Sequence, residues 1–182
     1  MEYENISYPL MELNERYISS LWSHFNGVQS PTLLDEAPYY LKEGILNSLF
    51  GVHLRRHPIF RRCHVDLIRQ ITAKFKTRHF FPGDMIAYSE DIDHCMYFIE
   101  YGEVHALTED SLYDEVIEDV LTNGDMFGFE QGIYLRIGHQ YTYKVAKNSF
   151  IVILQREDWI YLLEYYPASK LLLYDKTKEI LL

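Results

Sequence analysis

The residues that could do chemistry lack the spacing of a metal site or a catalytic triad. The eight histidines include no His-x-His pair, and no Glu follows at the ligand spacing of a cupin-type metal enzyme. No Ser-His-Asp or Cys-His arrangement can be argued from spacing, and there is no phosphate-binding P-loop. We therefore expect a protein that is not an enzyme, with no catalytic residue, no metal site and no resident cofactor.

The cysteines and the start of the chain bear on its compartment. The two cysteines, Cys63 and Cys95, form neither a disulfide framework nor a zinc motif, and they fit a reducing cytosol. The acidic start is unlike a signal peptide. No apolar run approaches the ~18 residues that span a bilayer. We expect a cytoplasmic chain without a transmembrane segment.

Charge is strongly segregated along the sequence, whose formal net charge is −10. A basic block between residues 53 and 79 holds Arg55, Arg56, Arg61, Arg62, Arg69, Lys74, Lys76 and Arg78. An acidic block from Asp84 to Glu130 holds 14 acidic residues and no Lys or Arg. An acidic surface disfavours nucleic acid. The basic block indicates either an electrostatic partner, internal or in a neighbouring subunit, or simply a solvated face.

Helical patterns fill the first part of the 182-residue chain. An apolar stripe with helical spacing predicts a helix over residues 10–25, which Asn26 and Gly27 end. A second segment covers 33–37. Pro38 opens a third helix that runs to about residue 50, where Gly51 stops it, and a short helical piece covers 52–56. Another helix is predicted over 65–76.

Short strands with glycine turns follow the helices. We predict strands over 79–81, 85–88, 96–99, 104–107, 116–121, 141–145 and 150–154, with turns at 82–84, 101–103 and 123–125. Helices return at 159–165 and, after an interruption at Pro167, at 169–182. The expected fold is α+β: short N-terminal helices, an antiparallel β-roll of the jelly-roll type, and two C-terminal helices. The expected domains are a helical linker over 1–62 and the β-roll with its flanking helices over 63–182.

Three motifs in this order resemble the cyclic-nucleotide-binding domain. Residues 81–86 read Phe-Pro-Gly-Asp-Met-Ile, as in the "PGD-x-I" turn. Residues 96–99 read Met-Tyr-Phe-Ile, and Gly-Glu-Val follows at 102–104, as in the next hairpin of that domain. Residues 123–128 read Asn-Gly-Asp-Met-Phe-Gly, which is similar to the entry of the phosphate-binding cassette.

The resemblance extends into the predicted linker. Residues 22–60 are similar to the helical linker of the hyperpolarisation-activated, cyclic-nucleotide-gated and ether-à-go-go cation channels. The matching features are Trp22 before Asn26-Gly27, the segment from Leu33-Leu34 to Pro38, and Leu54 before His57-Pro58-Ile59-Phe60. Kinase regulatory subunits and bacterial catabolite activators share the β-roll without this linker, so the linker selects channels.

The resemblance implies a ligand pocket. In the family, amides of a short helix and an Arg bind the phosphate, a Glu accepts from the ribose hydroxyl, apolar strand residues cover the purine, and the last helix closes as a lid. The candidate positions here are Ala106, Leu121, Phe127, Gly128, Glu130, Arg136, Tyr141, Thr142 and Ile180.

The sequence departs from the family at the phosphate. Tyr141 stands where the phosphate Arg is expected, and Phe129 holds the place of the Glu, with Glu130 following. A phenol does not replace a guanidinium against phosphate. Arg136 and then Lys144 are the nearest candidate cations. We expect cyclic AMP or cyclic GMP to be at most a weak ligand, with aromatic side chains of the chain itself, Tyr141, Tyr143 or Phe129, filling the pocket.

The function implied is that of a cytosolic gating module of a cation channel subunit, or of a soluble protein derived from one. Its expected partners are the pore domain and further copies of itself through the helical linker, up to a tetramer. It would lie at the inner face of a membrane. The alternative is a ligand-responsive cyclic AMP or cyclic GMP sensor that is soluble or part of a kinase-like regulator.

Overall fold

The computed structural model describes residues 37–109 and 114–181, together with isolated positions between 8 and 19. The chain divides into two compact units, residues 1–37 and 38–182, and the fold below is that of the second unit. The helices expected over 10–25 and 33–37 lie outside the described residues.

Two helices precede the sheet, and both differ in length from the sequence prediction. Helix α3, Tyr39–Arg56, runs straight through Gly51, so the stop predicted there is wrong. Burial explains the continuation: Phe50 and Leu54 are buried on either side of the glycine, which outweighs the ~1 kcal/mol that a helical glycine costs. Helix α4, Val65–Thr72, ends before the predicted residue 76, because Lys76 already begins the first strand.

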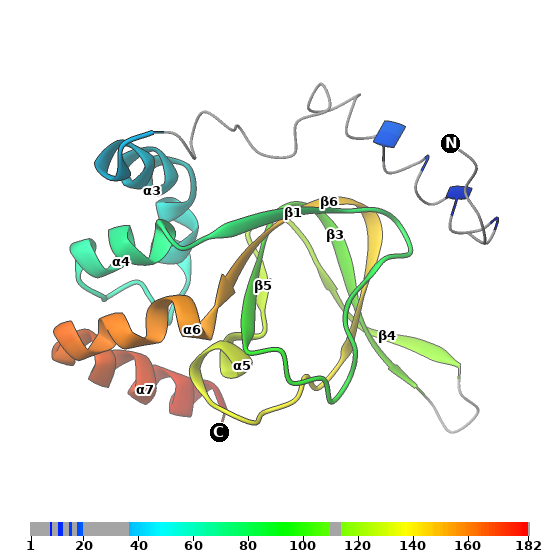
Figure 1. Ribbon diagram of the computed structural model, residues 1–182. Coiled ribbons are helices and arrows are strands. Elements are labelled where there is room, and N and C mark those ends of the chain that lie inside the picture. The colour runs from blue at the N-terminus through cyan, green and yellow to red at the C-terminus, as the bar shows by residue number, and fades with distance from the viewer. Residues whose placement is uncertain are drawn as a thin grey trace. The chain divides into compact units, whose positions relative to one another are not determined.

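Six strands form one antiparallel sheet that curls into the roll (Figure 1). They are β1 Lys76–Phe80, β2 Met85–Ala87, β3 Cys95–Glu109, β4 Glu115–Leu121, β5 Met126–Phe127 and β6 Thr142–Gln155. The order is β1-β6-β3-β4, while β2 pairs with β6 and β5 with β3. This arrangement confirms the predicted α+β class with its β-roll.

The two central strands are longer than predicted. The strands expected at 96–99 and 104–107 are one strand, β3, and those at 141–145 and 150–154 are β6. The turn predicted at Gly102 is wrong, because Gly102 lies within β3 where the register against β6 shifts. Its φ is +114°, and a Cβ there would lie 2.1 Å from Ser149 Oγ. Glycine is therefore needed for a bulge rather than for a hairpin turn.

The turns predicted at 82–84 and 123–125 are confirmed. In each, an Asp side chain accepts a hydrogen bond from a backbone N–H three residues earlier. Asp84 accepts from Phe81 and Asp125 from Thr122, both at 2.8 Å. These local bonds between side chain and backbone explain why the Gly-Asp pairs mark the turns so clearly in the sequence.

The remaining helices follow strands β5 and β6 in the chain. Helix α5, Phe129–Ile133, lies between β5 and β6. Helix α6, Arg156–Trp159, passes into a 3₁₀ turn, η1, Ile160–Tyr165, where one helix over 159–165 was predicted. Helix α7 spans Pro167–Leu181. Pro167 thus begins the last helix instead of interrupting the chain before it, as its fixed φ allows.

The core has two clusters of buried apolar side chains. One joins the helices to β3 and β6, with Leu54, Phe60, Leu67, Met96, Val152, Trp159 and Leu173 among its members. The other lies inside the roll, with Ile99, Val104, Ala106, Phe127, Val145 and Ile151. The rings of Phe60 and Trp159 meet edge to face at 6.0 Å. Residues 38–62, the end of the predicted linker, therefore share one apolar core with the helices beside the roll (Figure 1).

Over the described residues, the structure contains no helix with both the length and the apolar character needed to cross a membrane.

Candidate functional site

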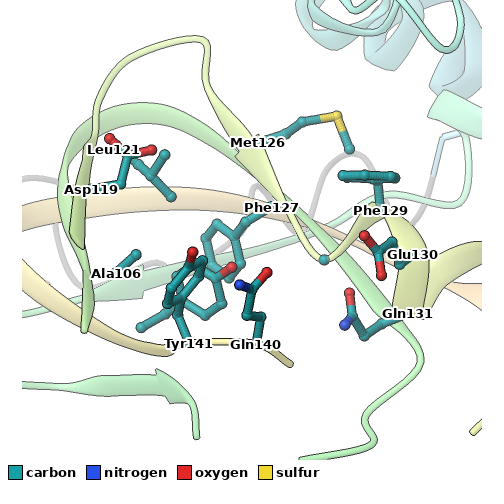
Figure 2. Close-up of a pocket in the computed structure, with 12 residues that line it drawn as sticks. Ala106, Asp119, Leu121, Met126, Phe127, Phe129, Glu130, Gln131, Gln140 and Tyr141 are labelled. Atoms are coloured by element: carbon teal, nitrogen blue, oxygen red, sulfur yellow. The ribbon is translucent and has the colours of Figure 1, made fainter. Parts of the chain in front are cut away.

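A cavity of about 200 Å³ opens beside β5 and α5. The structure brings six of the nine predicted site residues to its wall: Ala106, Leu121, Phe127, Gly128, Glu130 and Tyr141. Figure 2 shows Phe127 at the centre, with Asp119 and Glu130 on opposite sides of it and Tyr141 below. The strands β3 and β4, the β5–α5 turn and the start of β6 position these side chains. Their role in binding a ligand stays a prediction.

Three predicted site residues are not part of this wall. Arg136 is exposed on the loop between α5 and β6, with a φ of +62°. Thr142 lines a separate hollow, where its hydroxyl accepts a hydrogen bond from the Ser89 N–H at 3.0 Å. Ile180 lies in α7, but its side chain is outside the described part of the chain. Arg136 is therefore not among the residues that line this cavity, and its role as a substitute phosphate cation stays a prediction.

Sequence reasoning missed four of the lining residues: Asp119, Met126, Gln131 and Gln140. Phe129 and Tyr143, expected as aromatic filling, do line the cavity. Asp119 pairs directly with Ala106 across β4 and β3. Correct pairing of β3 with β4 would have placed Asp119 on the cavity wall. A bulge between Ala106 and Leu107 shifts the register of this pair, so the sequence alone does not predict the pairing.

The entry from β5 into α5 depends on Gly128. Its φ is +73°, and a Cβ there would lie 2.5 Å from the Cys95 carbonyl oxygen. Only glycine combines this backbone conformation with so close an approach. Further along, Gln131 donates to the Gly138 carbonyl at 2.8 Å, which ties α5 to the loop that leads into β6.

Stacked aromatic rings form the floor of the cavity. The ring of Phe127 lies between Tyr143, at 3.9 Å and 18°, and Tyr97, at 4.8 Å and 13°. Tyr141 meets Tyr143 edge-on at 6.5 Å. Each such pair adds about 0.5–1.5 kcal/mol beyond the area that it buries. The floor is therefore a rigid aromatic surface.

A cluster of three side chains, Asp93, Tyr97 and His139, packs against this aromatic floor. Asp93 accepts a hydrogen bond from the Tyr97 hydroxyl at 2.5 Å and lies 3.0 Å from His139 Nε2. Burial would raise the pKa of Asp93, but the contacts with His139 and Tyr97 outweigh it and lower that pKa. The His139 ring is only 2% exposed and packs edge-on against Phe127 and Tyr143. The orientation of the aromatic floor is thus coupled to Asp93.

The cavity is acidic and contains no cationic side chain. None of its twelve lining residues, all of them within the described ranges, is Lys, Arg or His. Burial raises the pKa of Glu130. Burial, and then the charges of Tyr141, Glu130 and Asp119, raise the pKa of Tyr143 to about 12. Lys144, the second candidate cation, pairs instead with Glu115 at 2.7 Å.

The basic block is partly paired within the fold. Arg69 lies 3.3 Å from Glu43 on α3, and Lys76 lies 2.9 Å from Asp158. These pairs show internal partners for two of its members. Four further arginines of the block are exposed, namely Arg55, Arg56, Arg61 and Arg62.

Comparisons with known proteins agree with the family resemblance. Residues 77–166 match the profile of the cyclic nucleotide-binding domain. The voltage-gated inwardly rectifying potassium channel KCNH6 of Gallus gallus is 29% identical over 169 residues, which cover 92% of this chain and 14% of that protein. KCNH6 of Rattus norvegicus is 28% identical over 170 residues, 92% of this chain and 17% of that protein. KCNH2 of Oryctolagus cuniculus is 28% identical over 168 residues, which cover 92% of this chain and 14% of that protein. The chain spans less than a fifth of the length of these relatives.

Proposed function

Because residues 77–166 match the cyclic nucleotide-binding domain family, we propose that this chain is the regulatory module of a cation channel subunit. The relatives that match 92% of its length are voltage-gated potassium channels. The match extends beyond the β-roll into the helical linker, which supports a channel rather than another protein with this domain. In this proposal the module lies at the cytoplasmic face of the membrane and meets the pore domain and other copies of itself through the linker.

The finer proposal is that the pocket does not bind cyclic AMP or cyclic GMP tightly. The observation that carries it is Tyr141 on the cavity wall, where the family places an arginine, together with the two carboxylates of Asp119 and Glu130. A buried charge-assisted contact to phosphate contributes ~2–5 kcal/mol. Its absence alone weakens binding by a factor of roughly 30 to several thousand. The acidic wall adds repulsion of the phosphate anion.

Regulation in such a module is an allosteric equilibrium. A bound ligand, or side chains that take its place, favours one position of the last helix, and the linker passes that bias to the pore. The shared core supports this route, since Leu173 of α7 belongs to the same buried cluster as Leu54 of α3. Only an interaction that differs between the two positions can produce the effect.

Calorimetric titration of the chain with cyclic AMP and cyclic GMP tests the finer proposal. We expect no low-micromolar binding, and we expect Tyr141→Arg to gain at least about tenfold in affinity, which corresponds to ~1.4 kcal/mol. Tyr165→Arg is the matched control, because Tyr165 is 76% exposed and does not line the cavity. A low-micromolar dissociation constant for the native chain would refute the proposal and favour a cyclic-nucleotide sensor.

A further inference from the structure

We propose that residues 134–141, the loop from α5 to β6, form a strap that the contact between Asp93 and His139 holds closed beside the cavity, under backbone strain. The inference concerns the regulation of this cavity, and it rests on the proposed function only in taking the cavity as the regulatory site. Release of the contact would free the strap and remove its last two residues, Gln140 and Tyr141, from the cavity wall. The strap would thus control access to the site.

The strap is anchored by one buried side chain. Of residues 134–141, all of them described, only His139 is buried, with 2% of its surface exposed. Its Nε2 lies 3.0 Å from Asp93 Oδ2, in the loop between β2 and β3. Both ring nitrogens are buried, and neither forms a well-aligned hydrogen bond with a described residue. Because buried polar atoms are normally hydrogen-bonded, the closed strap carries a cost that contact with water would remove on opening.

Backbone hydrogen bonds join the strap to the β2–β3 loop, residues 88–94. The His139 N–H donates to the Asp91 carbonyl at 3.1 Å, and the Glu90 N–H donates to the His139 carbonyl at 2.8 Å. At Gly138 the two backbones approach so closely that a Cβ would lie 2.7 Å from the Glu90 carbonyl oxygen. Both bonds involve His139, so displacement of this residue would break them together.

Backbone strain is concentrated in the same two loops. Among the described residues other than glycine, positive φ occurs at Glu90 (+70°), His94 (+57°) and Arg136 (+62°). All three lie in the β2–β3 loop or in the strap. Such residues adopt this conformation at a cost that the surrounding contacts must offset. Strain of this kind is found at switch segments, and it favours opening once the contact between Asp93 and His139 is lost.

The His139 side chain also connects the strap to the aromatic floor. Its ring packs edge-on against Tyr143 at 5.6 Å and against Phe127 at 6.4 Å. The next two residues, Gln140 and Tyr141, line the cavity, and Figure 2 shows both beside Phe127. Departure of His139 would therefore uncover one side of the floor and take part of the wall away with it.

Hydrogen exchange of backbone amides, followed by NMR, tests the strap in Asp93→Asn, which removes the charge and keeps the size of the side chain. We expect the His139 and Glu90 amides to exchange at least about tenfold faster, a factor that corresponds to ~1.4 kcal/mol, because exchange follows the population of the open strap. The Gly132 amide of α5 should exchange at the native rate. Glu157→Gln, an exposed acid on α6, is the matched control and should change none of these rates.

A second pair of variants tests the strain. Arg136→Gly relieves the positive φ of an exposed residue, so the closed strap should be more populated and the His139 amide should exchange more slowly. Leu135→Gly is the matched control, because Leu135 is 60% exposed and its φ is not positive. There the glycine adds only flexibility and should speed the same exchange. Opposite effects support the strap, and effects of the same sign overturn it.

The strap and the ligand proposal fail in different experiments. Unchanged exchange at His139 and Glu90 in Asp93→Asn, or an equal acceleration at Gly132, overturns the inference and leaves the proposed function intact. Low-micromolar binding of cyclic AMP in the calorimetric titration refutes the finer proposed function and leaves the exchange test unaffected.

Discussion

Replacement of Gly128 by alanine should destabilise the fold far more than the same change at Gly124. Both glycines have positive φ, +73° and +90°, so an alanine at either position carries the left-handed backbone strain, about 1–2 kcal/mol. At Gly124 an added Cβ meets nothing within 4 Å, whereas at Gly128 it would lie 2.5 Å from the Cys95 carbonyl oxygen and 3.3 Å from His139 Cε1. Relief of such overpacking costs a further ~1–3 kcal/mol.

We therefore expect Gly124→Ala to lower the free energy of unfolding by about 1–2 kcal/mol and Gly128→Ala by about 2–5 kcal/mol, the sum of strain and overpacking. Urea unfolding followed by far-UV circular dichroism measures both values, and equal slopes against urea would show that only stability has changed. If the two variants differ by less than ~0.5 kcal/mol, within the scatter of ordinary surface substitutions, the close approach of the β5–α5 turn to β3 is refuted.

Three further outcomes follow from charge and burial. Because burial raises the pKa of Glu130, the folded state binds this proton more readily than the unfolded chain, and stability falls as the pH rises above ~4.3. Glu130→Gln should thus be more stable than the native chain at pH 7 in urea unfolding, with a gain that disappears below about pH 4; a gain independent of pH would contradict this. Arg55 and Arg56 are exposed, so their joint replacement by Glu should weaken self-association at low salt in sedimentation, and unchanged sedimentation would argue against an acidic neighbour. Burial raises the pKa of Cys63 and Cys95 to about 11; at pH 8 only about one thiol in a thousand is then ionised, and both should alkylate slowly until urea unfolds the chain.

The sequence predicts the kinds of element well where local chemistry determines them. The turns at 82–84 and 123–125 follow from a Gly-Asp pair whose carboxylate closes the turn on the backbone. The start of α3 after Pro38 follows in the same way, since the Pro38 carbonyl accepts from the N–H groups of the first turn. These contacts span only a few residues, so the residue types at fixed offsets are enough to predict them.

The wrong predictions lie where distant residues decide. Gly51 is a helix stop by local preference, yet Phe50 and Leu54 are buried against segments far along the chain. Gly102 indicates a turn by composition, yet Ser149 of β6 packs against it inside a bulge. Tertiary contacts of this kind override propensity. Only part of the cavity could be predicted, for the same reason. The sequence motifs include Phe127 on its floor, whereas Asp119 reaches the wall through the pairing of β3 with β4, whose register is shifted by a bulge.

The acidic block from Asp84 to Glu130 is partly neutralised on the sheet but not in the cavity. Lys144 and Lys147 of β6 pair with Glu115 and Glu103 across the outer surface of the sheet, so part of the acidic block is neutralised there. Among the residues that the structure describes, none forms an ion pair with the Glu130 carboxylate on the cavity wall. A carboxylate that is partly buried and unpaired raises the free energy of the folded state. A phosphate would add to the same charge. In the proposed function, the acidic wall therefore disfavours the anionic ligand of the family.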